Sequence, residues 1–426
     1  MGMHSPAGLT TAQAPSLSLP LEHILAAIAS FVALSALLFW RFEGVAAGYW
    51  RNPDALVVTH LFTLGWVTML IMGAAYQLIP VVLQVPIYSE ALGHVTFAVF
   101  LAGLGIMLWS FWEFQVGLLA GGGSLVVAAT ALFLFNLAAT LFGLERWTLT
   151  ASYVASSLGH LALAVTWGLV LALNLGYGFL GATSPQNLLA HVAVGFFGWF
   201  TVTIFGYAYK LVPMFALAHD RPEVLGRVVL YLMNAGVLGV FAAGVAGAGR
   251  LVTAIPLVVL TAGVALFVAD LYGVFRQRRR RRLDVTMQFV ISALAYLVLT
   301  AGLTVTAASG GWARFGSDPR GPLALGAVAL LGWVSMLAVG QLYKVVPFLV
   351  WYHKYSERVG VEPVPLLRDM FSEPLAQAGL WLSNAGVLGL FGGLLAGASA
   401  LGRAGAGSWL AGSLVFAWSM AGVFRK

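Results

Sequence analysis

The sequence contains no cysteine among its 426 residues. This absence excludes disulfide bonds. It also excludes thiolate ligands for iron–sulfur clusters, for a dinuclear copper centre or for covalently attached haem. Any metal that the chain binds must therefore be held mainly by histidine, of which there are eight.

Charged residues are also scarce. Asp, Glu, Lys and Arg make up 9% of the chain, hydrophobic residues make up 60%, and the mean hydropathy is +0.92. A soluble protein of this length could not cover so much apolar surface, so the composition predicts an all-α integral membrane protein whose main partner is the lipid bilayer. Twelve apolar stretches are long enough to span it: 22–41, 55–84, 91–112, 116–142, 151–176, 187–217, 226–247, 251–275, 284–308, 321–351, 376–398 and 407–423.

Three of these stretches carry one pattern at a period of 133 to 134 residues. The pattern is Gly-Trp, a second Gly eight residues after the first, Tyr at plus eleven and Pro at plus fifteen, and its copies begin at Gly65, Gly198 and Gly332. At about 100° per residue the Gly, Tyr and Pro positions form one stripe of a helix, whose small residues let another helix approach closely. A fixed period of this length indicates internal triplication.

The pattern lies on the second, sixth and tenth stretches, so the repeat unit contains four helices. We predict a single transmembrane domain over 21–426, made of three pseudo-symmetric four-helix repeats at about 21–148, 149–282 and 283–426. A second motif supports this prediction. The sequence Asn-Ala-Gly-Val-Leu-Gly occurs twice and has a weaker echo earlier in the chain, at 234–239, 384–389 and 102–105. We interpret these small residues as packing surfaces.

Basic residues predict the orientation. They follow even-numbered stretches, as in the run at 276–282, and the chain ends in Arg425 and Lys426. The positive-inside rule then places both termini in the cytoplasm, in a multi-pass protein of the plasma membrane. The net charge of +7 needs no nucleic-acid partner. Residues 1–20, rich in Ser, Pro, Thr and Ala, are expected to be a disordered cytoplasmic tail rather than a cleaved signal peptide.

Two histidines precede copies of the pattern near the outer ends of their helices. His60 lies five residues before Gly65, and His191 lies seven residues before Gly198. On an α-helix these side chains point to faces roughly 160° apart, toward different spaces between helices. A single site that uses both is therefore not expected.

The other histidines have different settings. His160 lies deep in the fifth stretch, where its ring needs a hydrogen-bond partner or a metal. His23 and His94 fall near the cytoplasmic starts of the first and third stretches and are expected to be interfacial. His219 and His353 each follow a motif proline by six residues, which fits their origin in the repeat.

This combination resembles the catalytic subunit I of the haem-copper oxidase and nitric oxide reductase superfamily. The resemblance rests on twelve helices in three four-helix arcs, cytoplasmic termini, and a histidine near the outer end of helix two followed by Gly-Ala-Ala-Tyr-Gln-Leu-Ile-Pro at 73–80. The resemblance in helix arrangement extends over the whole chain. It implies the fold of cytochrome c oxidase subunit I, with His60 as an axial ligand of a low-spin haem and His191 as a candidate copper ligand.

Several ligands of that family are missing here. The family has two histidines on helix ten and a histidine pair on helix seven, whereas residues 321–350 and 226–247 contain none. The tyrosine that follows the helix-six histidine in many members is Gly195. The resemblance therefore implies an incomplete dinuclear site without copper. It leaves one haem b, held by His60 with Met336 as the candidate second axial ligand.

The implied function is haem-linked electron transfer or small-gas chemistry on O2 or NO, as an oxidoreductase served by a redox partner subunit or a cytochrome. The sequence assigns no catalytic residue. A transporter stays open as an alternative because pseudo-repeats around a pathway are common there, although Asp270 is the only clear carboxylate within an apolar stretch. A non-catalytic membrane subunit also stays open, in which His60 only caps the outer end of its helix.

Overall fold

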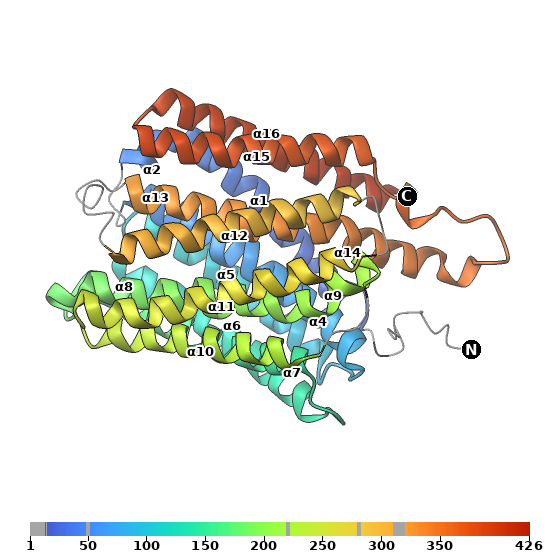
Figure 1. Ribbon diagram of the computed structural model, residues 1–426, viewed down its shortest axis with the longest axis horizontal. Coiled ribbons are helices and arrows are strands. Elements are labelled where there is room, and N and C mark those ends of the chain that lie inside the picture. Colours follow the sequence, from blue (N-terminus) through green and yellow to red (C-terminus); the bar gives the residue numbers. More distant parts are fainter. Residues whose placement is uncertain (1–12, 14, 48–51, 219–221, 279–282, 310–319) are drawn as a thin grey trace. The chain divides into compact units, whose positions relative to one another are not determined.

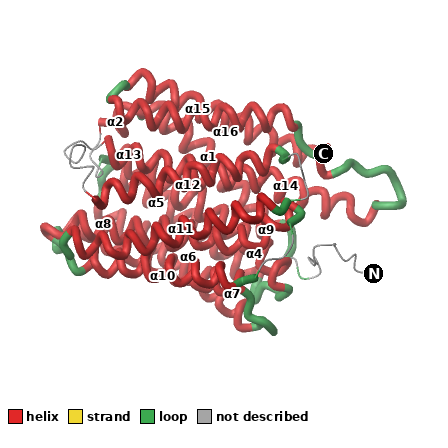
Figure 2. Tube along the Cα trace, in the orientation of Figure 1, coloured by secondary structure: helices red, strands yellow, loops and turns green. Residues whose placement is uncertain are grey.

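The computed structural model describes residues 13, 15–47, 52–218, 222–278, 283–309 and 320–426. The regular elements in these ranges are helices, and no strand occurs among them (Figures 1 and 2). The all-α class predicted from the composition is therefore confirmed.

The helices of the described residues form twelve spans that are long and apolar enough to cross a membrane, which indicates a multi-pass protein in a lipid bilayer. The second, sixth and tenth spans each contain a π-helix between two α-helices. In chain order the elements are α1 (Ser18–Trp40), α2 (Phe42–Ala47), α3 (Pro53–His60), η1 (Leu61–Thr68), α4 (Met69–Leu83), α5 (Glu90–Trp112), α6 (Val116–Phe142), α7 (Leu149–Tyr177), η2 (Gly181–Thr183), α8 (Ser184–Val192), η3 (Ala193–Thr201), α9 (Val202–Ala216), α10 (Val224–Val245), α11 (Arg250–Arg276), α12 (Val285–Ser309), α13 (Arg320–Gly326), η5 (Ala327–Ser335), α14 (Met336–Tyr355), η6 (Ser356–Arg358), η7 (Leu367–Asp369), α15 (Glu373–Ala396) and α16 (Ser399–Arg425).

Two helix starts differ from the sequence prediction. α1 begins at Ser18 instead of 22, and Leu19 and Pro20 are buried, so the expected tail does not extend to residue 20. The earlier part of the tail, 1–12 and 14, lies outside the described residues. α16 begins at Ser399 instead of 407 because its first turns, although helical, are rich in glycine and contain Arg403, which lowers their hydropathy.

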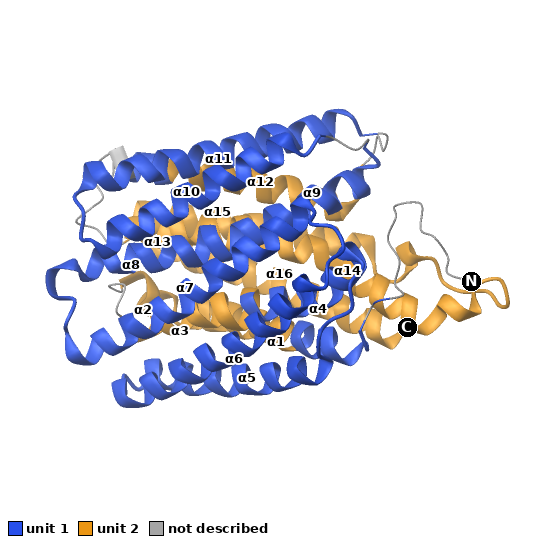
Figure 3. Cartoon of the chain, turned by 90° about the horizontal axis from the view of Figure 1, so that it is seen from below, with its two compact units in different colours: residues 1–25, 68–281, 304–310 blue, residues 26–67, 282–303, 311–426 orange. Residues whose placement is uncertain are grey.

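Contacts divide the chain into two compact units (Figure 3). Unit 1 comprises residues 1–25, 68–281 and 304–310, and unit 2 comprises residues 26–67, 282–303 and 311–426. The divisions pass through α1, η1 and α12. One further division lies near residue 282, where a predicted repeat boundary also falls, whereas the other divisions fall within the predicted repeats.

Three consecutive helix pairs approach each other through glycine: α5 with α6, α10 with α11, and α15 with α16. A Cβ atom on Gly103, Gly236 or Gly386 would lie 2.9, 2.7 and 2.7 Å, respectively, from a backbone nitrogen of the following helix. All three glycines belong to the second motif of the sequence. Its interpretation as a packing surface is therefore confirmed.

The stripe glycines make room for side chains of the preceding span. A Cβ on any of them would come within 2.9 Å of one such side chain. The two side chains received by each stripe are seven residues apart in the sequence. For the first glycine (Gly65, Gly198, Gly332) they are Ser30, His160 and Tyr296, and for the second (Gly73, Gly206, Gly340) they are His23, Tyr153 and Phe289.

Each motif span contains a π-helix at the same place. η1, η3 and η5 begin four or five residues before the first motif glycine and include the tryptophan that follows it. A π-helix turns less per residue than an α-helix because its hydrogen bonds join residues five apart. The predicted angle of 160° between the faces of His60 and His191 assumed an unbroken α-helix, so it does not apply to these spans.

Buried indole groups link different motif spans within each unit. In unit 2, Trp66 Nε1 donates a hydrogen bond to Ser335 Oγ over 3.0 Å. In unit 1, Trp199 Nε1 donates to Thr68 Oγ1 over 3.1 Å. All four residues are buried. In both cases the tryptophan of one copy reaches the hydroxyl residue that stands three positions after the first glycine of another copy.

The glycine contacts generate a stability prediction. Gly386→Ala should destabilise the detergent-solubilised protein by about 1–3 kcal/mol, because the added methyl group meets the backbone of α16. Gly422→Ala is the matched control, since a Cβ there meets nothing within 4 Å. Thermal unfolding followed by circular dichroism measures both variants. Equal melting temperatures would contradict the prediction.

The indole contact generates a second prediction. Trp199→Phe should destabilise the protein by about 1–3 kcal/mol, because the Thr68 hydroxyl loses its donor in an apolar interior. Thr68→Val removes the same hydrogen bond from the other side. The double variant should therefore cost less than the sum of the two single changes. Strict additivity in thermal unfolding would show that the hydrogen bond does not contribute.

Candidate functional site

His60 is the last residue of α3 and directly precedes the π-helix η1. Its side chain is half-buried, and Nδ1 lies 2.8 Å from the carbonyl oxygen of Leu56, one turn earlier. Because a carbonyl oxygen only accepts, Nδ1 carries the proton and Nε2 carries the lone pair. This is the tautomer with which a histidine binds a metal through Nε2.

The sequence around α3 fixes its start. Asn52 is the N-cap, and its side chain accepts a hydrogen bond from the backbone nitrogen of Asp54 over 2.9 Å. Pro53 occupies the first helical position, where its missing N–H costs nothing. The Asp54 carboxylate in turn pairs with Arg41 over 3.0 Å. This local network anchors the short helix that carries His60.

Met336, the predicted second axial ligand, is the first residue of α14 and is fully buried. Its neighbour Ser335 accepts the indole hydrogen bond of Trp66. Trp66 stands six residues beyond His60, within η1. Met336 is therefore packed at a level displaced from His60, and its role as a ligand stays a prediction.

His191 lies near the end of α8, immediately before η3. Its ring packs against α7 at Gly168, where a Cβ atom would lie 2.9 Å from Cε1 of the imidazole. Both ring nitrogens lie slightly farther from that position, at 3.6 and 3.7 Å. The glycine thus provides the space that the ring occupies. A copper-ligand role for His191 stays a prediction.

His160 has the partner that its depth in the membrane requires. Its Nε2 lies 3.0 Å from Oδ1 of Asn234 on α10, and this oxygen also accepts from the Ser156 hydroxyl over 2.7 Å. The opposite edge of the ring lies against Gly198. His160 is therefore fixed by an amide and by glycine packing.

Unit 2 contains the same arrangement with a tyrosine. The Tyr296 hydroxyl donates to Oδ1 of Asn384 over 3.0 Å, and its ring lies against Gly332. Asn234 and Asn384 are the first residues of the two copies of the second motif. Sequence reasoning assigned this motif to packing and missed the amide. An asparagine at the same motif position in two apolar helices was the signal for a buried hydrogen bond.

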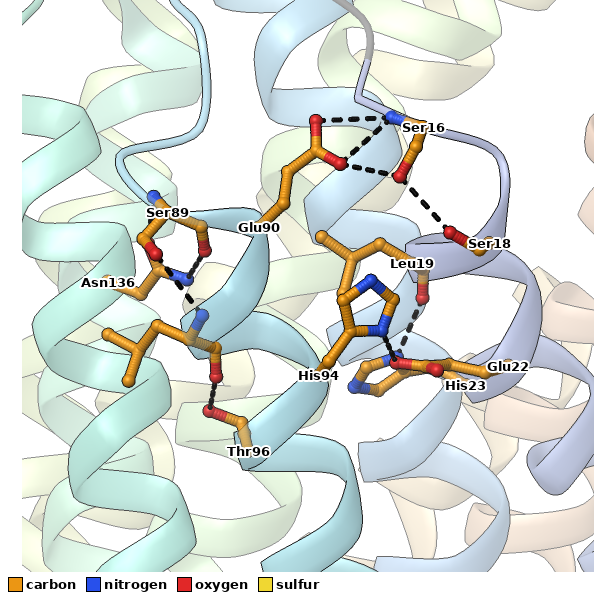
Figure 4. Close-up of polar contacts among 11 residues, drawn as sticks. Ser16, Ser18, Leu19, Glu22, His23, Ser89, Glu90, His94, Thr96 and Asn136 are labelled. Carbon is orange, nitrogen blue, oxygen red and sulfur yellow. Dashed lines mark hydrogen bonds and ion pairs between the residues drawn. The ribbon is translucent and has the colours of Figure 1, made fainter.

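A cluster of titratable side chains lies where α1 and α5 begin, in unit 1 (Figure 4). His94 Nδ1 donates to Glu22 Oε1 over 2.8 Å, and these side chains are 40% and 26% exposed. Glu90 accepts from the backbone nitrogen and the hydroxyl of Ser16. These contacts agree with the interfacial position predicted for His94.

His23, also expected to be interfacial, is instead fully buried. It lies more than one turn inside α1 because this helix starts earlier than predicted. Gly73 makes room for it, since a Cβ there would lie 2.8 Å from Cβ of His23. The rings of Tyr76 and Phe97 pack around it, with centroids 5.3 and 5.0 Å from its own.

His353 and His219 each follow a motif proline by six residues. His353 lies in the last turn of α14 and is exposed. His219 lies outside the described residues.

Within the described residues, no group of three or more His, Asp or Glu side chains is placed to hold a metal ion. A cavity of about 190 Å³ in unit 2 is lined by residues of α2, α13, α15 and α16, and it includes neither His60 nor Met336. The sequence matches no protein-family model and no curated protein. A functional proposal therefore rests on the contacts of the histidine side chains and on the resemblance of the sequence pattern.

Proposed function

We propose that this chain has the fold of haem-copper oxidase subunit I, built from three related four-helix repeats. Contacts that recur at matching positions support this proposal. The pair Tyr296–Asn384 in unit 2 corresponds to the pair His160–Asn234 in unit 1. The π-helices and the glycine contacts recur at matching places in all three motif spans.

We further propose that the chain serves haem-linked electron transfer, with one haem b bound by His60. The observation that carries this proposal is the hydrogen bond from His60 Nδ1 to the Leu56 carbonyl, which selects the tautomer that binds a metal through Nε2. His23 makes the same hydrogen bond to the carbonyl of Leu19, so this bond alone does not single out His60. The proposal therefore also rests on the position of His60 directly before the motif π-helix η1. π-Helical segments are frequent at functional sites.

The residues of the chain have defined tasks in this proposal. The Leu56 carbonyl fixes the orientation and the tautomer of the His60 ring, and the capped α3 holds its backbone. A bound haem would supply one-electron redox chemistry. Met336, the candidate second ligand, is fully buried at the start of α14. The proposal therefore depends on His60.

The proposal includes no copper. Three nitrogen ligands usually hold such a copper, and His191 is supported by no second histidine on the seventh or tenth span. Its ring is packed against Gly168. We therefore propose electron transfer rather than reduction of O2 or NO by this chain alone.

The distribution of basic residues supports an orientation for the chain in the membrane. Arg276, Arg425 and the other basic residues after even-numbered spans support cytoplasmic termini in the plasma membrane. Electrons would come from a redox partner subunit or a cytochrome.

His60→Ala tests the haem proposal. Removal of the ligand should abolish or broaden the Soret band and the reduced b-type bands of protein expressed with haem supplied. His353→Ala is the matched control, and it should leave the bands unchanged because that residue lies at the far end of another motif span. His160→Ala should also leave them unchanged, because its ring is held by Asn234. A colourless wild-type preparation would overturn the proposal.

Elemental analysis tests the absence of copper. The purified protein should contain no stoichiometric copper, and His191→Ala should not change its metal content. The reason is that His191 lacks the additional nitrogen ligands that copper requires. Stoichiometric copper in the wild type that disappears in His191→Ala would show that the chain assembles a copper site after all.

A further inference from the structure

Two buried polar atoms of unit 1, on side chains whose rings pack against each other, have no hydrogen-bond partner among the described residues. They are Nε2 of His23 and the hydroxyl group of Tyr76. Both residues are fully buried, and their rings meet edge-on with centroids 5.3 Å apart. Because His23 Nδ1 donates to the Leu19 carbonyl over 2.9 Å, Nε2 is an acceptor. The tyrosine hydroxyl can both donate and accept.

Leaving these atoms unpaired in an apolar interior would destabilise the folded protein. A buried water removes such a cost when it finds two to four polar partners. Further polar side chains are available here, since Thr96 and Asn136 lie beside the Tyr76 phenol and are themselves fully buried. The region therefore has the polarity that an internal water needs.

The other nitrogen of His23 lies near the helix end. Glu22 Oε1 is 3.7 Å from Nδ1 of His23 and 2.8 Å from Nδ1 of His94, which is partly exposed (Figure 4). An imidazole can take up a proton at one ring nitrogen and release one from the other. His23 thus lies between the partly exposed Glu22–His94 pair and the buried polar region around the Tyr76 hydroxyl.

Glu90 is the other charged group in this cluster. Its carboxylate points toward Ser16, from which it accepts hydrogen bonds of the backbone nitrogen and the hydroxyl (Figure 4). Glu90 therefore attaches the segment before α1 to the start of α5. Glu90 belongs to the same cluster as Glu22 but accepts from Ser16 instead of His94, so it can serve as a control for changes at Glu22.

We propose that His23 and Tyr76 bind one internal water, and that His23 carries protons between this water and the Glu22–His94 pair. In the outward direction, Nε2 takes a proton from the internal water, which becomes hydroxide, and Nδ1 then gives its own proton to the Glu22 carboxylate. The reverse steps return one proton from Glu22 through His23 to the hydroxide and restore the Nδ1–H tautomer. No net charge is left on His23 in either direction. The site is thus a proton pathway, and it is independent of whether haem binds at His60.

The water is tested by NMR of the full-length protein in lipid bilayers with ¹⁵N-labelled histidine. We expect His23 as the Nδ1–H tautomer, with an Nε2 signal typical of a hydrogen-bonded lone pair and with magnetisation transfer from water. Tyr76→Phe should shift this signal. Tyr343→Phe changes the corresponding tyrosine of the third motif copy and should not shift it. An Nε2 signal typical of an unbonded lone pair would overturn the proposal.

The proton route is tested by the exchange rate of the His23 ring proton with solvent. Glu22→Gln should slow this exchange by about 100-fold or more, because a positioned acid–base group is lost. Glu90→Gln is the control, and it should leave the rate unchanged. Circular dichroism and thermal unfolding confirm that each variant is folded. An exchange rate that is the same in Glu22→Gln and in the wild type would refute the route.

Discussion

Helices in hydrocarbon must be held together by close packing and by hydrogen bonds, because lipid is as apolar as the side chains that would be buried. This protein meets that constraint with glycine. Gly386 brings α15 onto the backbone of α16, and Gly73 and Gly198 make room for His23 and His160. The remaining structure depends on these approaches. A methyl group at the stripe positions would push the neighbouring span away, and the short hydrogen bonds between spans could not form.

Those hydrogen bonds use the few polar groups that the apolar spans contain. An indole meets a hydroxyl at Trp199 and Thr68, and an imidazole meets an amide at His160 and Asn234. In a medium of low dielectric constant such bonds are strong, and an unpaired polar group is costly. His23 has one nitrogen without a partner among the described residues, and its ring packs edge-on against that of Tyr76, whose hydroxyl also lacks a partner. This combination of two unpartnered atoms on packed rings is what distinguishes its surroundings from a purely structural contact.

The number of spans and their approximate ends could be predicted, because apolar composition over about 20 residues is a direct physical requirement of the bilayer. The packing role of the second motif could be predicted for the same kind of reason. The burial of His23 could not, since it depends on the early start of α1 and on Gly73, which is 50 residues away in the sequence. The amide role of Asn234 depends likewise on a partner from another helix. The π-helices were missed because hydropathy does not distinguish i+4 from i+5 hydrogen bonding.

The π-helices have a consequence for how the motif spans are divided. One additional residue in a helical turn changes the rotation of everything before it relative to everything after it, by about 100° for each residue. In the second span, His60 precedes η1, whereas Tyr76 follows it. The direction of the His60 side chain is thus uncoupled from the packing of the part of the span that follows η1. Deletion or insertion of a single residue in η1 would turn His60 toward a different neighbour while Gly73 and Tyr76 kept theirs.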